Sequence, residues 1–141
     1  MKFGKPTTKE SKSLVEMYLK RTRVFNPIES LELKESDCAK WLAKGLGDTG
    51  HMIIALDETG KEWGSLNFSK KLQSWIDDPG VKSLSFVIGG PYGLDQDIKS
   101  KAHELWSLSQ ATLPSDLAWV VSWEQLYRAF TILKGMPYHH G

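Results

Sequence analysis

The chain has 141 residues, a formal net charge of +1 and one cysteine, Cys38. Its length and 40% hydrophobic content predict a single globular domain over residues 1–141. The 18 Lys and Arg against 17 Asp and Glu exclude a global positive field, so an RNA partner requires a local patch, a second subunit or recognition of shape. A single cysteine excludes an intrachain disulfide, and no apolar run approaches the roughly 18 to 20 residues that span a bilayer. We therefore expect a soluble, cytoplasmic protein with no membrane or DNA partner.

The N-terminal part of the chain predicts one helix after a short strand. Residues 1–8 are polar and leave room for only a stub of strand. Apolar residues at helical spacing predict a helix over residues 9–23 that ends before Asn26-Pro27. Basic residues on its opposite side indicate a solvated face, with a phosphate contact as the minority alternative.

Weaker signals follow, and then a strongly apolar strand. Residues 28–33 are half polar and predict an edge strand. Ser36 is expected to cap a short helix that the glycines at positions 45, 47 and 50 end. The apolar run over residues 51–57 ends in an acid and Glu58-Thr59-Gly60, which is typical of a strand buried on both faces. Such strands belong to parallel sheets.

The middle of the chain predicts a helix, a buried strand and a glycine loop. Ser65 is expected to cap a helix that ends near Asp77. Residues 83–88 are apolar and rich in β-branched side chains, and Gly89-Gly90-Pro91-Tyr92-Gly93 follows at once. Glycines after a strand let backbone N–H groups approach a bound molecule closely, although such a turn is more often only a sharp turn.

The last third predicts two helices joined by a loop. Asp95 is expected to cap a helix that continues through Trp106, and residues 107–114 form the loop. Residues 115–133 form the longest helix, which is apolar on more than one side. We expect it to be buried against its own core and against another subunit. Strands and helices that alternate in this way predict a three-layer α/β domain with a mostly parallel sheet.

Four segments of the second half occur in a recognisable order. They are Ser85-Phe86-Val87-Ile88-Gly89-Gly90-Pro91-Tyr92-Gly93-Leu94, Leu108-Ser109-Gln110-Ala111-Thr112-Leu113-Pro114, Glu124-Gln125-Leu126-Tyr127-Arg128-Ala129 and Pro137-Tyr138-His139. Together they resemble the ribosomal large-subunit pseudouridine N3-methyltransferases, the RlmH family, a single-domain branch of the SPOUT methyltransferases. The resemblance is specific over residues 51–140 and loose before residue 50.

The resemblance implies a fold, a cofactor and partners. Members of the family have a C-terminal trefoil knot, act as homodimers and bind S-adenosyl-L-methionine at three loops. On this chain these loops carry Leu56, Gly89, Leu108, Ser109, Gln110, Ala111, Thr112 and Leu113. Adenine needs an apolar slot and a few backbone donors and acceptors, which such loops supply. The sequence has no Cys/His cluster, so we expect no metal site.

Methyl transfer to a uracil-type nitrogen needs alignment of donor and acceptor and removal of one proton. The candidates for these tasks are Glu124 and Arg128, one turn apart on the long helix, with Tyr138 and His139 in the tail. Arg128 is suited to an RNA phosphate or a developing oxyanion, and histidine accepts protons near neutral pH. The alternatives are an ordinary ion pair between Glu124 and Arg128 and a frayed tail. His51 and His103 are expected to be solvated.

The chain departs from the family pattern at four places. Its first strand is short, and Tyr92 replaces an acidic or polar residue in the glycine loop. Ser115 and Trp119 stand where the family has a histidine and an arginine. The leading hypothesis is a methyltransferase that modifies N3 of a pseudouridine in 23S ribosomal RNA within the assembled ribosome. The alternatives are a catalytically impaired dimeric RNA or ribosome binder, and a SPOUT methyltransferase with another RNA target.

Overall fold

The computed structural model describes residues 1–46 and 48–141. Gly47, one of the glycines expected to end the second helix, lies outside the described residues. The elements are β1 (Lys2–Phe3), α1 (Lys9–Arg23), β2 (Glu32–Leu33), η1 (Glu35–Asp37, a 3₁₀ turn), α2 (Cys38–Leu46), β3 (His51–Glu62), α3 (Ser65–Asp77), β4 (Ser83–Ile88), α4 (Gln96–Lys101), β5 (Glu104–Ser107) and α5 (Ser115–Leu133).

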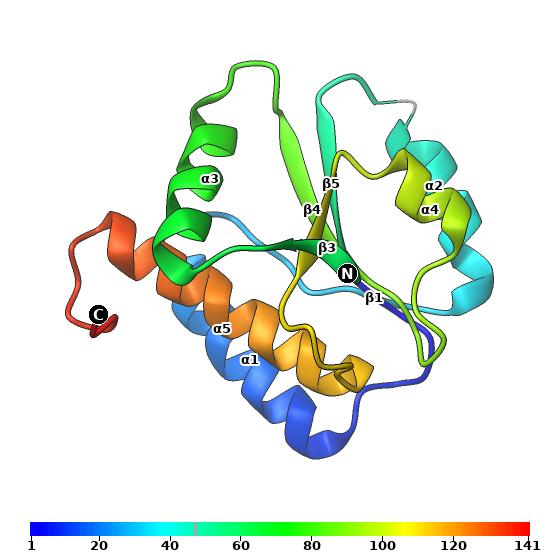
Figure 1. Cartoon of the computed structure of the whole chain (residues 1–141), viewed down its shortest axis with the longest axis horizontal. Helices are drawn as coiled ribbons and strands as arrows, with labels where there is room; N and C mark the ends of the chain where they lie inside the picture. Colours follow the sequence, from blue (N-terminus) through cyan, green and yellow to red (C-terminus); the bar gives the residue numbers. More distant parts are fainter. Residues whose placement is uncertain (47) are drawn as a thin grey trace.

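The five strands form one parallel sheet in the order β2-β1-β4-β3-β5. Helices α1, α3 and α5 cover one face, over a core that includes Phe68, Trp106 and Trp123. Helices α2 and α4 cover the other face, over a smaller core that includes Ile53 and Val87 (Figure 1). The predicted three-layer α/β architecture with a parallel sheet is confirmed. The trefoil knot stays a prediction.

Strand β3 is longer than the sequence predicts. The expected turn at Glu58-Thr59-Gly60 lies inside the strand, which continues to Glu62. Its pairing with β5 shifts register between Leu56 and Lys61, so the strand is irregular where the turn was expected. A Cβ on Gly60 would lie 2.6 Å from the carbonyl carbon of Leu105, so glycine serves close strand approach here rather than a turn.

The helix predicted over residues 95–106 is wrong in its second half. Helix α4 ends at Lys101, Ala102 has extended backbone angles, and residues 104–107 form β5. Apolar spacing fits either structure over so short a stretch, and pairing with β3 decides the outcome. Trp106 is buried and stacks on Phe68 with ring centroids 4.3 Å apart. The loop before α5 therefore begins at Leu108.

Other elements of the same chain cover several of the apolar sides of helix α5. The ring of Tyr127 packs against Tyr18 of α1 at 6.0 Å and against Phe25 at 6.3 Å. Leu117 and Val121 stay exposed on the same helix. Part of the α5 surface that was expected to contact a second subunit is thus covered by α1 and the segment after it. A smaller apolar part of α5 stays exposed.

Several helix starts differ in detail from the expected caps. Gly64, rather than Ser65, is the N-cap of α3, and no side chain caps this helix. Asp95 holds the N-cap position of α4, but its side chain makes no capping bond.

No helix in the described residues has both the length and the apolar character needed to cross a membrane.

Strand β1 is short, as predicted, and Met1, directly before it, places its amino group against β4. The Met1 nitrogen donates to Phe86 O at 2.6 Å. Next to it, the buried Lys2 side chain donates to Lys5 O at 2.6 Å and pairs with Asp116 at 3.3 Å. Burial lowers the pKa of the Met1 amino group from its usual 8.0 to about 5.

This buried amine predicts a pH dependence of stability. Between pH 8 and about pH 5 the Met1 amino group is protonated in the unfolded chain but neutral in the folded chain. Folding therefore becomes less favourable as pH falls through this range. The full loss is about 4 kcal/mol at 1.36 kcal/mol per pKa unit. Urea unfolding at pH 5 and pH 8 of the free and the N-acetylated protein measures it. Equal pH dependence of the two forms would contradict the expectation.

Candidate cofactor loops and polar network

The structure brings the predicted cofactor segments to one edge of the sheet. Leu56 pairs with Ile88 of β4 on one side and with Trp106 of β5 on the other. Gly89 follows Ile88 directly, and Leu108 follows the last residue of β5. All three segments therefore meet at the carboxyl ends of β4 and β5, beside the middle of β3, which continues to Glu62. This is the edge at which open α/β sheets bind ligands.

The loop over residues 108–113 is held by its own hydrogen bonds and by β3. Thr112 Oγ1 donates to Glu58 Oε2 at 2.9 Å, which ties the loop to the irregular part of β3. Ser107 Oγ donates to Ser109 O at 3.0 Å, and Ala111 N donates to Ser109 Oγ at 3.0 Å. Gln110, Ala111 and Thr112 are exposed. The loop is thus preorganised while part of its surface stays open to a ligand.

The glycine loop is folded tightly on itself. A Cβ on Gly89 would lie 2.4 Å from the carbonyl carbon of Gly93, and one on Gly4 would lie 2.8 Å from the Cα of Gly90. Gly89 and Gly90 are buried, whereas the loop tip is open and Tyr92 is 96% exposed. Gly89 and Gly4 are therefore required by contacts within the protein, in addition to any approach of a ligand.

An ion pair lies beside this edge. Lys99 Nζ is 2.6 Å from Asp57 Oδ2, and Thr59 donates to Asp57 Oδ1 from both its backbone and its hydroxyl. Burial opposes the ionisation of Asp57, but the bonds from Lys99 and Thr59 outweigh it, so the pKa of this carboxyl is lowered. Asp57 is a charged anchor for the strand end and is poorly placed to take a proton at neutral pH.

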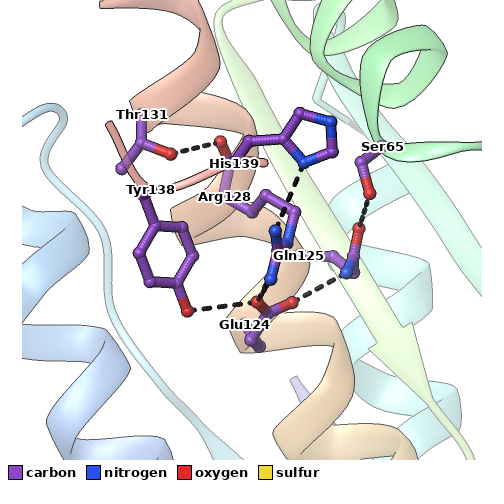
Figure 2. A network of polar contacts seen from close by, with 7 residues as sticks. All are labelled: Ser65, Glu124, Gln125, Arg128, Thr131, Tyr138 and His139. Atoms are coloured by element: carbon purple, nitrogen blue, oxygen red, sulfur yellow. Dashed lines mark hydrogen bonds and ion pairs between the residues drawn. The ribbon is translucent and has the colours of Figure 1, made fainter. Parts of the chain in front are cut away.

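The candidate catalytic residues form one polar network, shown in Figure 2. Glu124 Oε1 accepts from Arg128 Nε at 3.0 Å and from the Tyr138 hydroxyl at 3.2 Å. Arg128 Nη1 is 3.3 Å from His139 Nδ1. The tail is therefore tied to α5 by both of its candidate side chains, and a frayed tail does not describe this structure.

Two residues that the sequence did not single out extend the network (Figure 2). Gln125 Nε2 donates to Glu124 Oε2 at 2.7 Å, and Ser65 Oγ donates to Gln125 Oε1 at 2.9 Å. Gln125 stands beside Glu124 within one of the family-like segments, so the segment itself was the available signal. Ser65 lies 60 residues away, and only the packing of α3 against α5 reveals it.

The network favours a charged Arg128 and a neutral Tyr138. The hydrogen bond that Arg128 donates to Glu124 raises the pKa of the guanidinium above its ordinary value. Burial, with the neighbouring Tyr18 and Glu124, raises the pKa of the Tyr138 phenol. The guanidinium carbon of Arg128 also lies 4.9 Å from the centroid of the Tyr138 ring. Tyr138 can thus donate a hydrogen bond, but it does not serve as an anionic base near neutral pH.

The geometry constrains the proton on His139. An arginine guanidinium has no acceptor, so Nδ1 must accept from Arg128 in this arrangement. The proton of the neutral ring then sits on Nε2.

In one chain the network and the cofactor loops lie apart. Figure 1 places the C-terminal tail at the left edge near α3, and the loop after β4 on the right near α4. A cavity of about 970 Å³ lies elsewhere, between β4, α3 and α5, and none of the predicted cofactor residues lines it.

Trp119, one of the residues expected to depart from the family pattern, is part of the core. It is buried, and its ring lies edge-on to that of Trp123 with centroids 5.9 Å apart. Ser115 is the first residue of α5.

The expectation that His51 is solvated is wrong. His51 is half-buried against Trp41 and shares a hydrogen bond with Ser83.

His103 is exposed, as expected, but it also has a structural role. The ring Nδ1 of His103 accepts from the backbone N–H of Ile53 at 3.0 Å, and the backbone N–H of His103 donates to Ile53 O at 2.8 Å. In the described residues no group of three or more His, Cys, Asp and Glu side chains is arranged to hold a metal ion.

Comparisons with known proteins agree with this architecture. A family described as "Predicted SPOUT methyltransferase" matches residues 1–139. Ribosomal RNA large subunit methyltransferase H of Maridesulfovibrio salexigens is 53% identical over 89 residues, which make up 63% of this chain and 56% of that protein. The protein of the same name from Flavobacterium psychrophilum is 36% identical over 152 aligned positions, covering 98% of this chain and 95% of that protein.

Solved structures show the same fold at low identity. The SpoU methyltransferase AviRb from Streptomyces viridochromogenes matches with a TM-score of 0.52 and 15% identity, covering 96% of this chain and 60% of that chain. A structure of AviRb in complex with AdoMet gives a TM-score of 0.50 at the same identity, covering 96% of this chain and 57% of that chain. Because the identity is so low, this likeness concerns the fold alone.

Proposed function

Because the chain belongs to the SPOUT methyltransferase family, we propose that it transfers a methyl group from S-adenosyl-L-methionine to ribosomal RNA. The observation that carries the proposal is the convergence of Leu56, Gly89 and the 108–113 loop at one carboxyl edge of the sheet. The two sequence relatives named above are ribosomal RNA large subunit methyltransferases, and the similarity covers 98% of this chain for one and 63% for the other.

The residues at this edge fit such a cofactor. The loop over residues 108–113 combines the apolar side chains of Leu108 and Leu113 with exposed hydroxyl, amide and backbone groups. Apolar surface with a few fixed polar groups is what an adenosine moiety requires. The cofactor residues in this proposal are Leu56, Gly89, Leu108, Ser109, Gln110, Ala111, Thr112 and Leu113.

The cofactor, when bound, supplies an activated methyl group on a sulfonium centre. The protein must then align the acceptor nitrogen with the methyl carbon and help the nitrogen lose its proton. As the nitrogen–carbon bond forms, the carbon–sulfur bond breaks and its electron pair stays on sulfur. No further covalent step is required of the protein.

Arg128 and the tail residues have distinct roles in this proposal. Arg128 stabilises the negative charge that develops on the base or holds an RNA phosphate. Glu124 fixes the guanidinium and does not itself take the proton, because Oε1 already accepts from Arg128 and Tyr138. Tyr138 donates a hydrogen bond, and His139 receives the proton once RNA displaces Arg128 from Nδ1.

We propose further that the active protein is a homodimer. The separation of the tail network from the cofactor loops within one chain supports this, because a partner would supply its own tail across the interface. Leu14 of α1 and Leu117 and Val121 of α5 are exposed apolar residues on two helices that pack together, and they would form part of that interface.

The proposed substrate is a pseudouridine N3 in 23S ribosomal RNA of the assembled ribosome, which places the protein in the cytoplasm. A net charge of +1 supports a substrate recognised by shape rather than naked RNA held by charge. The trefoil knot belongs to the same proposal. Trp119 and Ser115, in place of two polar residues, favour the impaired ribosome binder as the second candidate.

Methyl transfer to ribosomal RNA tests this proposal. The protein is incubated with methyl-labelled S-adenosylmethionine and either assembled ribosomes, isolated large subunits or protein-free RNA, followed by nucleoside mass spectrometry. We expect N3-methylpseudouridine with assembled ribosomes and little with free RNA. A different methylated nucleoside would indicate another RNA target. Ribosome binding without any methylation would instead support the non-catalytic binder.

A further inference from the structure

A row of aromatic rings connects α1 to the candidate catalytic network. The rings of Tyr18 on α1 and Tyr127 on α5 lie 6.0 Å apart, and Tyr127 contacts Tyr138 edge-on at 4.7 Å. The guanidinium carbon of Arg21 lies 5.9 Å from the centroid of the Tyr18 ring and 5.8 Å from that of Tyr127. Arg128 lies over Tyr138 at the other end. Three tyrosine rings therefore form a row with a guanidinium at each end.

The two guanidiniums of this row differ in their electrostatic surroundings. Arg128 pairs with Glu124 and has Nη1 3.3 Å from His139 Nδ1, so its charge is compensated and several of its donors are occupied. Arg21 is exposed, and no carboxylate within residues 1–46 and 48–141 forms an ion pair with it. The planar fork of an arginine matches a phosphate, and contact with two rings favours a fixed position of the guanidinium. Arg21 is therefore the member of the row that is available to an anion.

An open hollow on the surface of α1 adjoins Arg21. Its volume is about 390 Å³, and its lining residues are Ser13, Glu16, Met17, Lys20 and Arg21. Lys20 adds a second exposed positive charge and Ser13 adds a hydroxyl, whereas Glu16 offsets one charge. Because Arg21 borders both the hollow and the tyrosine rings, a polyanion that follows α1 meets Arg21 before it reaches the network.

The chemistry of this surface favours RNA over a second copy of the chain. Rings that alternate with guanidiniums are typical of surfaces that bind single-stranded nucleic acid, where cations hold phosphates and flat groups stack on bases. The exposed apolar residues Leu14, Leu117 and Val121 lie nearer the N-terminal ends of α1 and α5, outside the row. Burial of an unpaired guanidinium between two copies is costly, whereas RNA brings one phosphate for each nucleotide.

We propose that Arg21 binds a backbone phosphate of the RNA strand, beside the nucleotide whose base enters the polar network of Figure 2. The proposal rests on the proposed function, and it assigns the phosphate contact to Arg21 rather than to Arg128. Arg128, which is held by Glu124, is left to the charge that develops on the base. Arg21 thus determines how tightly RNA is held and not the rate of methyl transfer from bound RNA.

Ribosome binding at several salt concentrations tests this assignment. Arg21→Gln removes the charge, and Arg21→Lys keeps the charge but loses the planar fork. Lys12→Gln is the matched control, because Lys12 is exposed on α1 and does not line the hollow. We expect Arg21→Gln to weaken binding to assembled ribosomes about 10-fold or more and to reduce the slope of log Kd against log salt by about 0.7 to 0.9. Arg21→Lys should keep the slope and recover most of the affinity.

The control and the methylation kinetics give the results that would overturn the assignment. Lys12→Gln should change the affinity by less than about 2-fold, because an exposed charge away from the RNA is screened. Equal affinity and salt slope in Arg21→Gln and Lys12→Gln would exclude a phosphate contact at Arg21. With saturating ribosomes, Arg21→Gln should transfer methyl groups within about 2-fold of the unmodified rate, and its half-saturating ribosome concentration should rise as its Kd does. A slower rate at saturation with an unchanged half-saturating concentration would overturn a role in binding alone.

Two further measurements distinguish RNA binding from structural roles of Arg21. A loss of self-association in Arg21→Gln by sedimentation equilibrium would assign this residue to a contact between copies. A lower urea midpoint in Arg21→Gln, with no recovery of ribosome affinity in Arg21→Lys, would make its role structural. We expect neither, because the Arg21 side chain is exposed.

The binding assay needs no methyl donor, so its result is independent of the proposed activity. Weaker ribosome binding by Arg21→Gln, together with no methylation by the unmodified protein, would support the phosphate contact and overturn the methyltransferase. Methylation by the unmodified protein with an unchanged half-saturating concentration in Arg21→Gln would support the methyltransferase and overturn the phosphate contact.

Discussion

Removal of residues 138–141 is expected to lower methyl transfer by about 100-fold or more while the protein stays folded. The deletion takes away the proton acceptor His139 and the donor Tyr138, and a positioned acid or base contributes on the order of 10² to 10⁴ in rate. The folding cost is small because the Glu124–Arg128 pair lies within α5 and survives. The main loss is the Tyr138 ring packing on Tyr127, about 1 kcal/mol. Single-turnover rates and urea unfolding measure the two effects.

Point variants distinguish the contributions of the Tyr138 and His139 side chains from a general effect of removing the tail. His139→Ala should retain folding and lose most of the rate, whereas His140→Ala, at an exposed neighbour, should change neither. Tyr138→Phe keeps the ring against Tyr127 and removes only the hydroxyl that reaches Glu124. If the shortened protein methylates at the full rate, the tail has no part in catalysis, and Arg128 must act without it.

Gly89→Ala is expected to lower the affinity for S-adenosylmethionine by at least about 10-fold. The new Cβ would lie 2.4 Å from the carbonyl carbon of Gly93 and 2.6 Å from Leu94 N, so the backbone of the loop has to move. Overpacking of this kind costs about 1 to 3 kcal/mol in stability, and a loop displaced at the cofactor edge loses affinity at least about 10-fold. Calorimetric titration measures the affinity, and urea unfolding measures the stability.

Gly64→Ala is the matched control for this substitution. Gly64 has φ −61°, and a Cβ there would meet nothing within 4 Å, so alanine is accommodated at the start of α3. This variant should keep both cofactor affinity and nearly full stability. Gly89→Ala with unchanged affinity would remove the glycine loop from the cofactor site.

The sequence predicts the elements whose signal is long and periodic. The helices over residues 9–23, 65–77 and 115–133 have the predicted bounds, because many apolar positions define each of them. The segment around Trp106 fails because a few apolar residues after a helix fit a strand equally well, and only the pairing with β3 decides. His51 fails for a related reason, since its burial depends on Trp41 and Ser83 from other elements.

The candidate site is predictable in composition but not in arrangement. The segments with Leu56, Gly89 and Leu108 are each recognisable, and strand order explains why they meet at one edge. The sequence could not identify Ser65 as part of the polar network, because Ser65 contacts Gln125 only through the packing of α3 on α5.

Calorimetric titration of the unmodified protein with S-adenosylmethionine tests most directly whether the carboxyl edge of β3, β4 and β5 is a methyl-donor site. We expect saturable binding at one site per chain with a Kd below about 1 mM. Absence of binding at several millimolar donor would contradict the proposed methyltransferase activity.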